Sequence, residues 1–390
     1  MNAFQVSEAW DGFQSVRGSN RFAVERNQQV LQLMEVLENK KGNRLAVWAM
    51  QVQEAMGQGR FPILFGDIID RQMLQSFQSA PRIMSPLMRM ANLGSMREVR
   101  RYKDEGYSKR FEEVEENAEY QGGAKSHLYW TYAPKKYGRK FEFSLEEMLN
   151  DDMGFFTRLP QDLAQGAINT EDWFLTSMFF GTAGPLDSFF RKGTAYNGTT
   201  YGQNAVSQLV LSEENLGIAI AEMMGSGTNS SSYRSKDGEP ILNSPRYLMV
   251  PPALELRARQ ILNSASLIVS GPITATSTAT TQGSLNVISQ LNLQLKVNPW
   301  MPVVITSGTI GHTSWSLFSE TVNPGELGKV SGRSEPEVFL QSANAVRVGG
   351  GGEASPFDGS FANDSIAYKC RYIFGGTPLD PRGGWASKGQ

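Results

Sequence analysis

The sequence predicts an α+β protein, because helical spacing dominates its first half and strand-like alternation dominates its second. The clearest helical signal is the segment 144–181, where apolar or small side chains recur every three or four residues. A highly charged stretch, 98–142, precedes it, and a region rich in Ser, Thr and β-branched residues, 264–320, follows. This order of a charged stretch, a long helix and a β-rich region is the main clue to function.

Length and composition indicate a folded protein with little net charge. The chain has 390 residues, of which 40% are hydrophobic and 19% charged, so it can bury a sizeable core. A net charge of −2, from 37 basic and 39 acidic residues, argues against a strongly basic nucleic-acid binder. The single cysteine, Cys370, excludes an internal disulfide and suits a reducing cytosol. The N-terminus lacks a signal-peptide pattern, and no apolar run is long enough to span a bilayer.

The first 80 residues predict an arm followed by helices. Residues 1–22 are polar with scattered aromatics and predict an extended arm, and apolar stripes at 30–37 and 45–56 predict two helices. Residues 61–77 predict a shorter amphipathic helix. The two stripes either pack on their own domain or reach a neighbouring subunit, and the sequence leaves both alternatives open.

Residues 98–142 are the most charged part of the chain, with ten basic and nine acidic residues in 45 positions. The spacing predicts a hairpin in which 128–132 pairs with 140–143 around a turn through Pro134 and Gly138. A segment this charged cannot fold inward without burying unpaired charges, so we expect it to project. Its length exceeds that of an ordinary connection, which favours a functional role.

The segment 144–181 predicts one long, kinked helix. Ser144 is expected to cap its start, with Glu147 completing a capping box. Pro160 and Gly166 are expected to bend the helix without ending it, because the apolar stripe continues beyond both. Gly181 supplies the stop signal.

The second half predicts two helices among several strands. The helices are 211–224, capped by Ser212, and one that opens at Pro251-Pro252. The predicted strands are 246–250, 285–297, 302–306, 314–320 and 366–374. Polar loops are expected at 185–211 and 225–240, and a glycine-rich joint at 349–352.

Signals for enzyme chemistry are weak, and the sequence predicts no catalytic residue, cofactor or metal. His127 and His312 are the only histidines, and neither has a second ligand at metal-binding spacing. Cys370 alternates with Tyr368 and Tyr372, which favours a small core residue over a nucleophile. The acidic run 112–119 lacks the glycine and the spacing of a calcium loop, so a solvated or partner-facing run is favoured.

Three local phrases, in their order along the chain, carry a resemblance to a known family. They are Phe65-Gly66-Asp67-Ile68-Ile69-Asp70-Arg71, Tyr137-Gly138-Arg139-Lys140-Phe141 and Tyr247-Leu248-Met249-Val250-Pro251-Pro252-Ala253-Leu254. With the layout above, the chain resembles the major capsid proteins of tailed bacteriophages, and more narrowly the Mu-like major head subunits. None of the phrases is a catalytic signature, so the resemblance depends on their order.

The resemblance implies an HK97-like capsid fold with an N-terminal helical arm, an extended charged loop, a peripheral domain with a long spine helix, and an axial domain. The implied division is 1–97 for the arm and helices, 98–142 for the extended loop, 143–184 for the spine helix, 185–345 for the axial domain, and 346–390 for the return to the peripheral domain and the tail. It implies a major head protein that assembles through pentamers and hexamers into an icosahedral shell around double-stranded DNA.

The same resemblance implies where neighbouring subunits meet. The candidate inter-subunit residues all lie in the charged stretch and are Arg100, Arg101, Lys103, Lys109, Arg110, Glu112, Glu113, Glu115, Glu116, Lys125, Trp130, Lys135, Lys136, Arg139 and Lys140. Some relatives form lysine–asparagine cross-links between subunits. Lys125, Lys135 or Lys136 with Asn363 would be candidates by region only, since no motif aligns them.

The implied partners follow from a shell that encloses DNA without gripping it. Separate scaffold and portal proteins are expected, with decoration proteins as a further option and no membrane. Since Met1 is retained, scaffold and protease would be separate proteins. The protein would be assembled in the host cytoplasm and reside in the virion.

Two alternatives stay open at this point. The nearer is an encapsulin-type nanocompartment shell, which would enclose protein cargo instead of DNA. The more distant is a cytosolic enzyme or binding protein with an unrecognised carboxylate site, which would form a small oligomer with a deep pocket.

Overall fold

The computed structural model describes residues 61–105, 110–111, 113–117, 119–120, 122, 126–144, 155–190, 208–225, 233–234, 239, 241–264, 266–269, 282–286, 288–341 and 365–390. They divide into two compact units. The first unit takes its described residues from the chain up to Ala80, from Lys136–Ile168 and from Glu335–Tyr372. The second takes them from Pro81–Lys135, Asn169–Ser334 and Ile373–Gln390. Helix α6 (Phe155–Phe179) and strand β14 (Ser365–Pro378) contribute residues to both.

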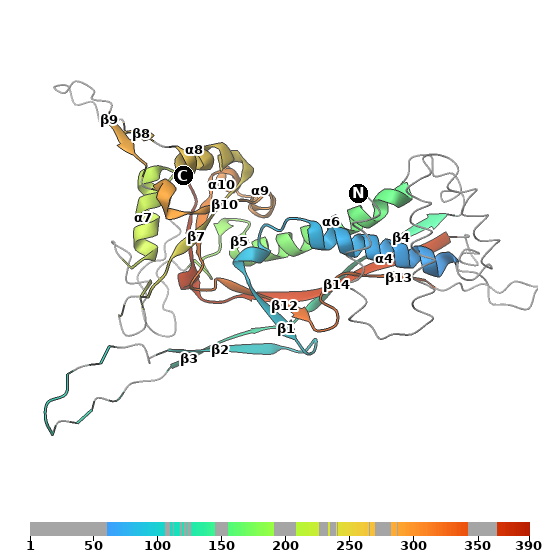
Figure 1. Ribbon diagram of the computed structural model, residues 1–390, viewed down its shortest axis with the longest axis horizontal. Coiled ribbons are helices and arrows are strands. Elements are labelled where there is room, and N and C mark those ends of the chain that lie inside the picture. The colour runs from blue at the N-terminus through green and yellow to red at the C-terminus, as the bar shows by residue number, and fades with distance from the viewer. Residues whose placement is uncertain are drawn as a thin grey trace, which may run out of the picture. The chain divides into compact units, whose positions relative to one another are not determined.

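In the first unit a helix packs on a small sheet. Strands β4 (Lys135–Ser144) and β13 (Glu337–Leu340) both pair with β14, and helix α4 (Phe61–Ser79) lies beside them (Figure 1). The rings of Phe77 and Tyr372 meet edge to face at 5.5 Å, and the sulfur atoms of Met73 and Cys370 are 3.9 Å apart. The buried face of α4 therefore covers the buried, alternate residues of β14, as the alternation of that strand predicts.

In the second unit the first sheet has a parallel edge. Strand β1 (Arg89–Leu93) is parallel to β12 (Gly325–Val330), which is antiparallel to the second part of β14 (Figure 1). The C-terminal half of α6 packs here, with the rings of Phe174 and Phe374 at 5.3 Å. Glu171 of α6 is buried, and its carboxylate contacts Arg82 at 2.8 Å and Lys329 at 3.2 Å. Two cations thus compensate one buried carboxylate of the helix.

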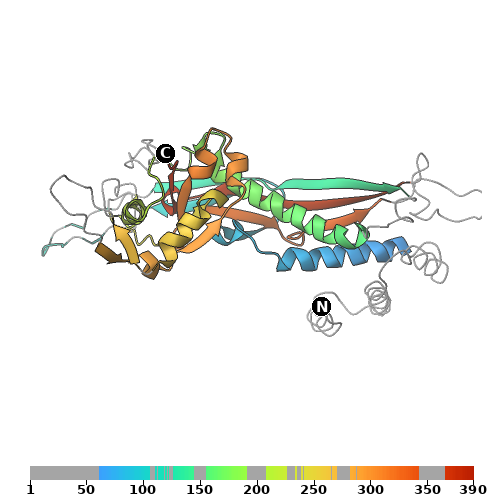
Figure 2. The same cartoon turned by 90° about the horizontal axis from the view of Figure 1, so that it is seen from above.

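The second sheet of this unit has the order β10-β7-β11-β15. Its strands are β10 (Gln294–Val297), β7 (Pro245–Val250), β11 (Trp315–Ser319) and β15 (Gly384–Ser387). Helices α7 (Glu213–Met223) and α8 (Glu255–Asn263) contribute to its apolar core. Figure 2 shows α8 running alongside this sheet. Trp315 and Trp385 are adjacent in the core, with ring centres 4.7 Å apart.

The other elements are short or form separate strand pairs. They are η1 (Ser85–Leu87), β2 (Val99–Glu105), β3 (Ser126–Tyr132), β5 (Phe180–Gly181), β6 (Gly184–Pro185), η3 (Pro252–Leu254), β8 (Ser266–Val269), β9 (Gln282–Leu285), η4 (Ile288–Leu291), α9 (Met301–Val304), α10 (Ile310–Thr313) and η6 (Pro381–Gly383).

Several local predictions are confirmed. The α+β class holds, and the predicted helices at 61–77 and 211–224 are α4 and α7. Ser212 caps α7, because its hydroxyl accepts a hydrogen bond from the Asn215 amide at 3.2 Å. The strands expected at 246–250, 314–320 and 366–374 are β7, β11 and β14, and Pro252 opens the turn that leads into α8.

The predicted pairing of 128–132 with 140–143 is wrong. Strand β3 pairs with β2, in a register that runs from Val99 opposite Tyr132 to Glu105 opposite Ser126. Strand β4 pairs with β14, and Gly138, the expected turn residue, lies within β4. A Cβ atom at Gly138 would come within 2.6 Å of the Cys370 carbonyl oxygen, so the glycine permits this close pairing.

The predicted start of the long helix stays a prediction. Ser144 is the last residue of β4, and 145–154, where the first turns of the predicted helix would lie, are outside the described residues. Phe141 of β4 stacks on Tyr368 of β14 at 5.8 Å, which shows that strand pairing prevails at this end. The helix α6 begins at Phe155, continues through Pro160 as predicted, and ends at Phe179.

Two further strand predictions are wrong, the one for 285–297 because of two asparagines and the one for 302–306 because of a proline. The alternation over 285–297 is divided into β9, η4 and β10, because the Asn286 side chain accepts from the Ile288 amide at 3.0 Å and turns the chain. Asn292, with φ of 52°, ends η4 in the left-handed region. Residues 302–306 contain the helical turn α9, where Pro302 stands at a favoured first-turn position.

The remaining sequence predictions lie outside the described residues. They are the arm and helices of 1–60, most of the loops expected at 185–211 and 225–240, and the joint at 349–352.

Candidate functional site

The predicted contact residues of 98–105 and 126–132 lie on one two-stranded ribbon, which is drawn in Figure 1 as the pair β2 and β3. Directly opposed residues of an antiparallel pair point to the same side. One face therefore carries Val99, Tyr132, Arg101, Trp130, Lys103 and Leu128. The other face carries Arg100, Thr131, Tyr102, Tyr129, Asp104 and His127.

The first of these faces, the inner face, is anchored by a buried carboxylate, Glu326 of β12. Glu326 has no exposed surface, and its Oε1 accepts from Arg101 Nε at 2.6 Å and from the Tyr132 hydroxyl. The hydrogen bond to Glu326 raises the pKa of Arg101. Burial, together with the same carboxylate, raises the pKa of the Tyr132 hydroxyl. Both groups thus stay protonated and donate to a charge that would otherwise be costly to bury.

A glycine makes room for this contact. A Cβ atom at Gly328 would lie 2.5 Å from the Tyr132 hydroxyl oxygen, closer than atoms can approach. Tyr132 reaches Glu326 only because position 328 has no side chain. Leu128 and Tyr132 are both buried, so the inner face combines apolar packing with the ion pair.

The second anchor of the inner face is Asp380, which Lys103 contacts with its ammonium group. Arg382 binds the same carboxylate through Nε at 2.9 Å and Nη2 at 2.6 Å. Burial alone would raise the pKa of Asp380, but the hydrogen bonds and charges of Arg382 and Lys103 outweigh it and hold that pKa below its ordinary value. Asp380 is therefore a carboxylate at neutral pH, with two cations as partners.

The opposite, outer face is exposed. Tyr102 and Tyr129 lie directly across from each other, and 66% and 67% of their surface is open to solvent. Next to them, His127 Nδ1 lies 2.5 Å from the Asp104 carboxylate, and both residues are exposed. Arg100 is exposed as well. An exposed aromatic pair flanked by charges is the type of surface that protein interfaces use.

The segment between β2 and β3 carries the acidic candidates. Glu113, Glu115 and Glu116 are exposed, and Arg110 Nε lies 3.6 Å from Glu239. Lys109, Glu112 and Lys125 lie outside the described residues, as does Asn363.

The last four candidates are not on the ribbon. Lys135, Lys136, Arg139 and Lys140 are exposed residues of β4, and Lys140 pairs with the neighbouring Glu142. The structure therefore divides the described candidates into three groups, which lie on the β2–β3 ribbon, in the segment between its strands, and on β4. Their role in subunit contacts stays a prediction.

The anchoring carboxylates Glu326 and Asp380 were missed by sequence reasoning, which treats an isolated charge as a surface residue. For Glu326 the sequence gives no signal, because the burial of every residue in its strand, Gly325–Val330, is seen only in the structure. For Asp380 the signal is the pattern Asp-Pro-Arg, in which the aspartate accepts from the Arg382 amide at 3.0 Å.

Enzyme-type features are sparse in the part of the chain that the structure describes. It contains no group of three His, Cys, Asp or Glu residues that could hold a metal ion, and none of its helices is long and apolar enough to cross a membrane. Cys370 is buried, as predicted for a core residue, and burial raises the pKa of its thiol to about 11.

Comparison with known proteins gives one match of sequence and several of structure. The family model for phage capsid protein matches residues 129–387. No curated protein sequence matches the chain.

The structural matches are distant. A structure from Gordonia phage Cozz is 12% identical over 78% of this chain and 85% of its own, with a TM-score of 0.44. One from Mycobacterium phage Ogopogo is 14% identical over 80% and 97%, with a TM-score of 0.42. An encapsulin complex from Synechococcus elongatus is 9% identical over 79% and 87%, with a TM-score of 0.41. Because each TM-score is below 0.5, assignment to a family rests on the sequence match.

Proposed function

Because the chain belongs to the phage capsid protein family, we propose that it is the major head subunit of a tailed bacteriophage. The observation that carries this proposal is the family match over residues 129–387, which is more than half of the chain. The family resemblance predicted from the sequence is thereby confirmed. The narrower Mu-like group stays a prediction.

In this proposal the protein works by assembly and performs no reaction. Pentamers and hexamers would close an icosahedral shell, of HK97-like fold, around double-stranded DNA in the host cytoplasm. The small net charge of −2 supports a container, because a strongly basic lumen would bind DNA tightly. Scaffold, portal and decoration proteins would be separate partners.

The proposed division of labour follows the five predicted segments. They are 1–97 for the arm, 98–142 for the extended loop, 143–184 for the spine helix, 185–345 for the axial domain and 346–390 for the return segment. The outer face of the β2–β3 ribbon supports the role of the loop, since it presents Tyr102 and Tyr129 to solvent while the inner face is held within its unit.

Negative-stain electron microscopy tests the function directly. The chain is purified after expression alone and together with candidate scaffold proteins. Closed shells, tubes or rings of five and six are expected. A homogeneous small oligomer under every condition would contradict the proposal and favour an enzyme or binding protein. Shells that contain a co-purified enzyme instead of DNA would point to a nanocompartment.

A loop replacement tests the role of the extended segment. Residues 106–125 are replaced by Asn-Gly, since Glu105 and Ser126 are the last paired residues and such a dipeptide closes two antiparallel strands. The variant is expected to keep the wild-type thermal unfolding midpoint but to form no closed shells. Normal shells from this variant would refute a role for the segment between the strands.

A further inference from the structure

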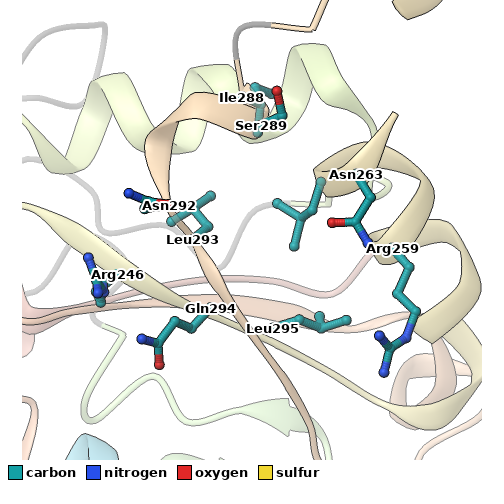
Figure 3. Close-up of a pocket in the computed structure, with 10 residues that line it drawn as sticks. Arg246, Arg259, Asn263, Ile288, Ser289, Asn292, Leu293, Gln294 and Leu295 are labelled. Atoms are coloured by element: carbon teal, nitrogen blue, oxygen red, sulfur yellow. The ribbon is translucent and has the colours of Figure 1, made fainter. Parts of the chain in front are cut away.

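The second unit contains an open hollow of about 440 Å³ next to strand β10. Its walls come from β7 and α8 and from η4 and β10, two neighbouring pairs of elements that lie about 25 residues apart in the sequence. Figure 3 shows Arg246 and Arg259 at opposite ends of the hollow, with Gln294 and Leu295 between them. None of the described residues that line it is acidic. The hollow therefore has two positive ends and a neutral middle.

The two arginines are only weakly compensated. The Nε atom of Arg246 is buried without a hydrogen bond to any described residue, and the nearest carboxylate oxygen, on Glu320, is 3.9 Å away. Arg259 is paired with Glu255 at 2.8 Å, one turn back on the same exposed helix face. Exposed pairs of this kind contribute little and exchange readily for a better partner. Both guanidinium groups are thus available to an anionic ligand.

The rest of the lining suits a peptide. Asn263, Asn292 and Gln294 are exposed side chains with amide groups that can hydrogen-bond to a peptide backbone. Leu293 and Leu295 are half-buried and provide an apolar floor for side-chain methylene groups. A row of phosphates would need further cations along the hollow, and its middle carries none. Two arginines separated by amides and leucines match a short acidic peptide better than a nucleic-acid backbone.

The chain itself carries such a peptide. Residues 110–120, Arg-Phe-Glu-Glu-Val-Glu-Glu-Asn-Ala-Glu-Tyr, contain five glutamates and one arginine, a net charge of −4. Glu113, Glu115 and Glu116 are exposed and have no ion pair with any described residue. Residues 116–117 form a turn, in which Asn117 has φ of 67°. Glu113, Glu115 and Glu116 are therefore presented to solvent without compensating charge from the described part of the chain.

We propose that the hollow between Arg246 and Arg259 binds the acidic run 113–116 of a second copy of this chain. The inference rests on the proposed function only for the presence of neighbouring copies. The two regions are complementary in charge, and neither has a strong ionic partner among the residues that the structure describes. Complementary charges of this kind fix register and partner choice between subunits.

A peptide-binding measurement tests the proposal without requiring a shell. The probe is a fluorescent peptide of residues 110–120, titrated by anisotropy with the unassembled full-length chain at low salt. We expect saturable binding that weakens as salt is raised. A peptide with glutamine at the five glutamate positions should bind at least about tenfold more weakly. Equal binding of the two peptides, or no binding of the native one, would overturn the proposal.

Matched variants locate the binding site. The double variant Arg246→Glu and Arg259→Glu should lose at least about tenfold in affinity, and Arg246→Gln with Arg259→Gln should lose less. Arg257→Glu is the control, because Arg257 is an exposed arginine of α8 that does not line the hollow. Circular dichroism checks that each variant is folded. If Arg257→Glu weakens binding as much as the double variant, the effect is general charge and the assignment is wrong.

A charge exchange links the site to assembly. The variant Arg246→Glu with Arg259→Glu should fail to form wild-type shells, and adding Glu113→Arg, Glu115→Arg and Glu116→Arg should restore them. Shells that form normally with the reversed hollow would contradict the proposal while leaving the shell function intact. Peptide binding by a wild-type chain that never forms shells would instead support the site and refute the proposed function.

Discussion

The inner face of the β2–β3 ribbon and the hollow beside β10 both depend on cations, but they use them differently. Arg101 and Lys103 meet Glu326 and Asp380, whose carboxylates are 0% and 5% exposed. Arg246, at the hollow, has as its nearest carboxylate among the described residues that of Glu320, which is 60% exposed and 3.9 Å away. A cation with a buried partner is required by the fold, because separating the pair leaves an uncompensated buried charge. A cation whose partner is exposed can be transferred to another molecule at little cost.

The largest effect is expected from Glu326→Gln. Removing this charge leaves Arg101 and Tyr132 facing a neutral amide, and breaking a buried pair costs about 3 kcal/mol or more. Urea denaturation of the unassembled chain measures the change in the free energy of unfolding. Glu320→Gln is the control and should change it by less than about 1 kcal/mol. If both variants lose the same free energy of unfolding, the fold does not depend more on the buried carboxylate of the ribbon than on the exposed one near the hollow.

A pH series on Asp380→Asn should give the next largest effect. The pKa of Asp380 is lowered in the folded chain, so its charge stabilises the fold above the unfolded value of about 4. This contribution is lost as the pH falls through the lower, folded pKa. The unfolding free energies of the wild type and the variant should differ most above about pH 5 and converge only as the pH falls through the lowered, folded pKa of Asp380. A difference that is independent of pH would show that Asp380 acts by packing alone.

The two faces of the ribbon should respond unequally to truncation. Leu128→Ala removes a buried side chain, 5% exposed, and should cost about 2–3 kcal/mol. Tyr129→Ala, at the next position, removes an exposed ring and should cost less than about 1 kcal/mol. Thermal unfolding of the two unassembled variants measures both. A larger loss for Tyr129→Ala would mean that the face described as open is packed within the chain.

Sequence reasoning recovered local features and missed tertiary ones, for a physical reason. The cap at Ser212 and the buried alternation around Cys370 depend on nearby residues, and both appear in the structure. Alternation shows which residues of 128–132 share a face, but it carries no information on the partner strand, so β2 was not recognised. The alternation over 285–297 is interrupted by one side-chain hydrogen bond of Asn286, and the spacing of apolar residues does not indicate such a bond.

The same contrast between local and tertiary features applies to the candidate sites. Charge density identified the acidic run and the ribbon cations directly from composition. The hollow was not predictable, because Arg246, Arg259 and Gln294 come from three segments that only the fold brings together. Buried carboxylates such as Glu326 were missed because a lone charge predicts exposure unless its cation partner, here 225 residues away, is known.

The smallest effect on stability is expected when both arginines of the hollow are neutralised, and it tests the difference between the ribbon and the hollow most directly. The double variant Arg246→Gln with Arg259→Gln removes both positive charges of the hollow. Because each of these arginines pairs with an exposed carboxylate, the free energy of unfolding should fall by less than about 1 kcal/mol in total. Arg101→Gln removes the only cation within hydrogen-bond distance of the buried Glu326 carboxylate among the described residues, so it should cost about 2 kcal/mol or more. Urea denaturation at matched protein concentration compares the two variants. A double variant as unstable as Arg101→Gln would mean that the fold itself requires the hollow's arginines. They would then not be free to bind a neighbouring subunit.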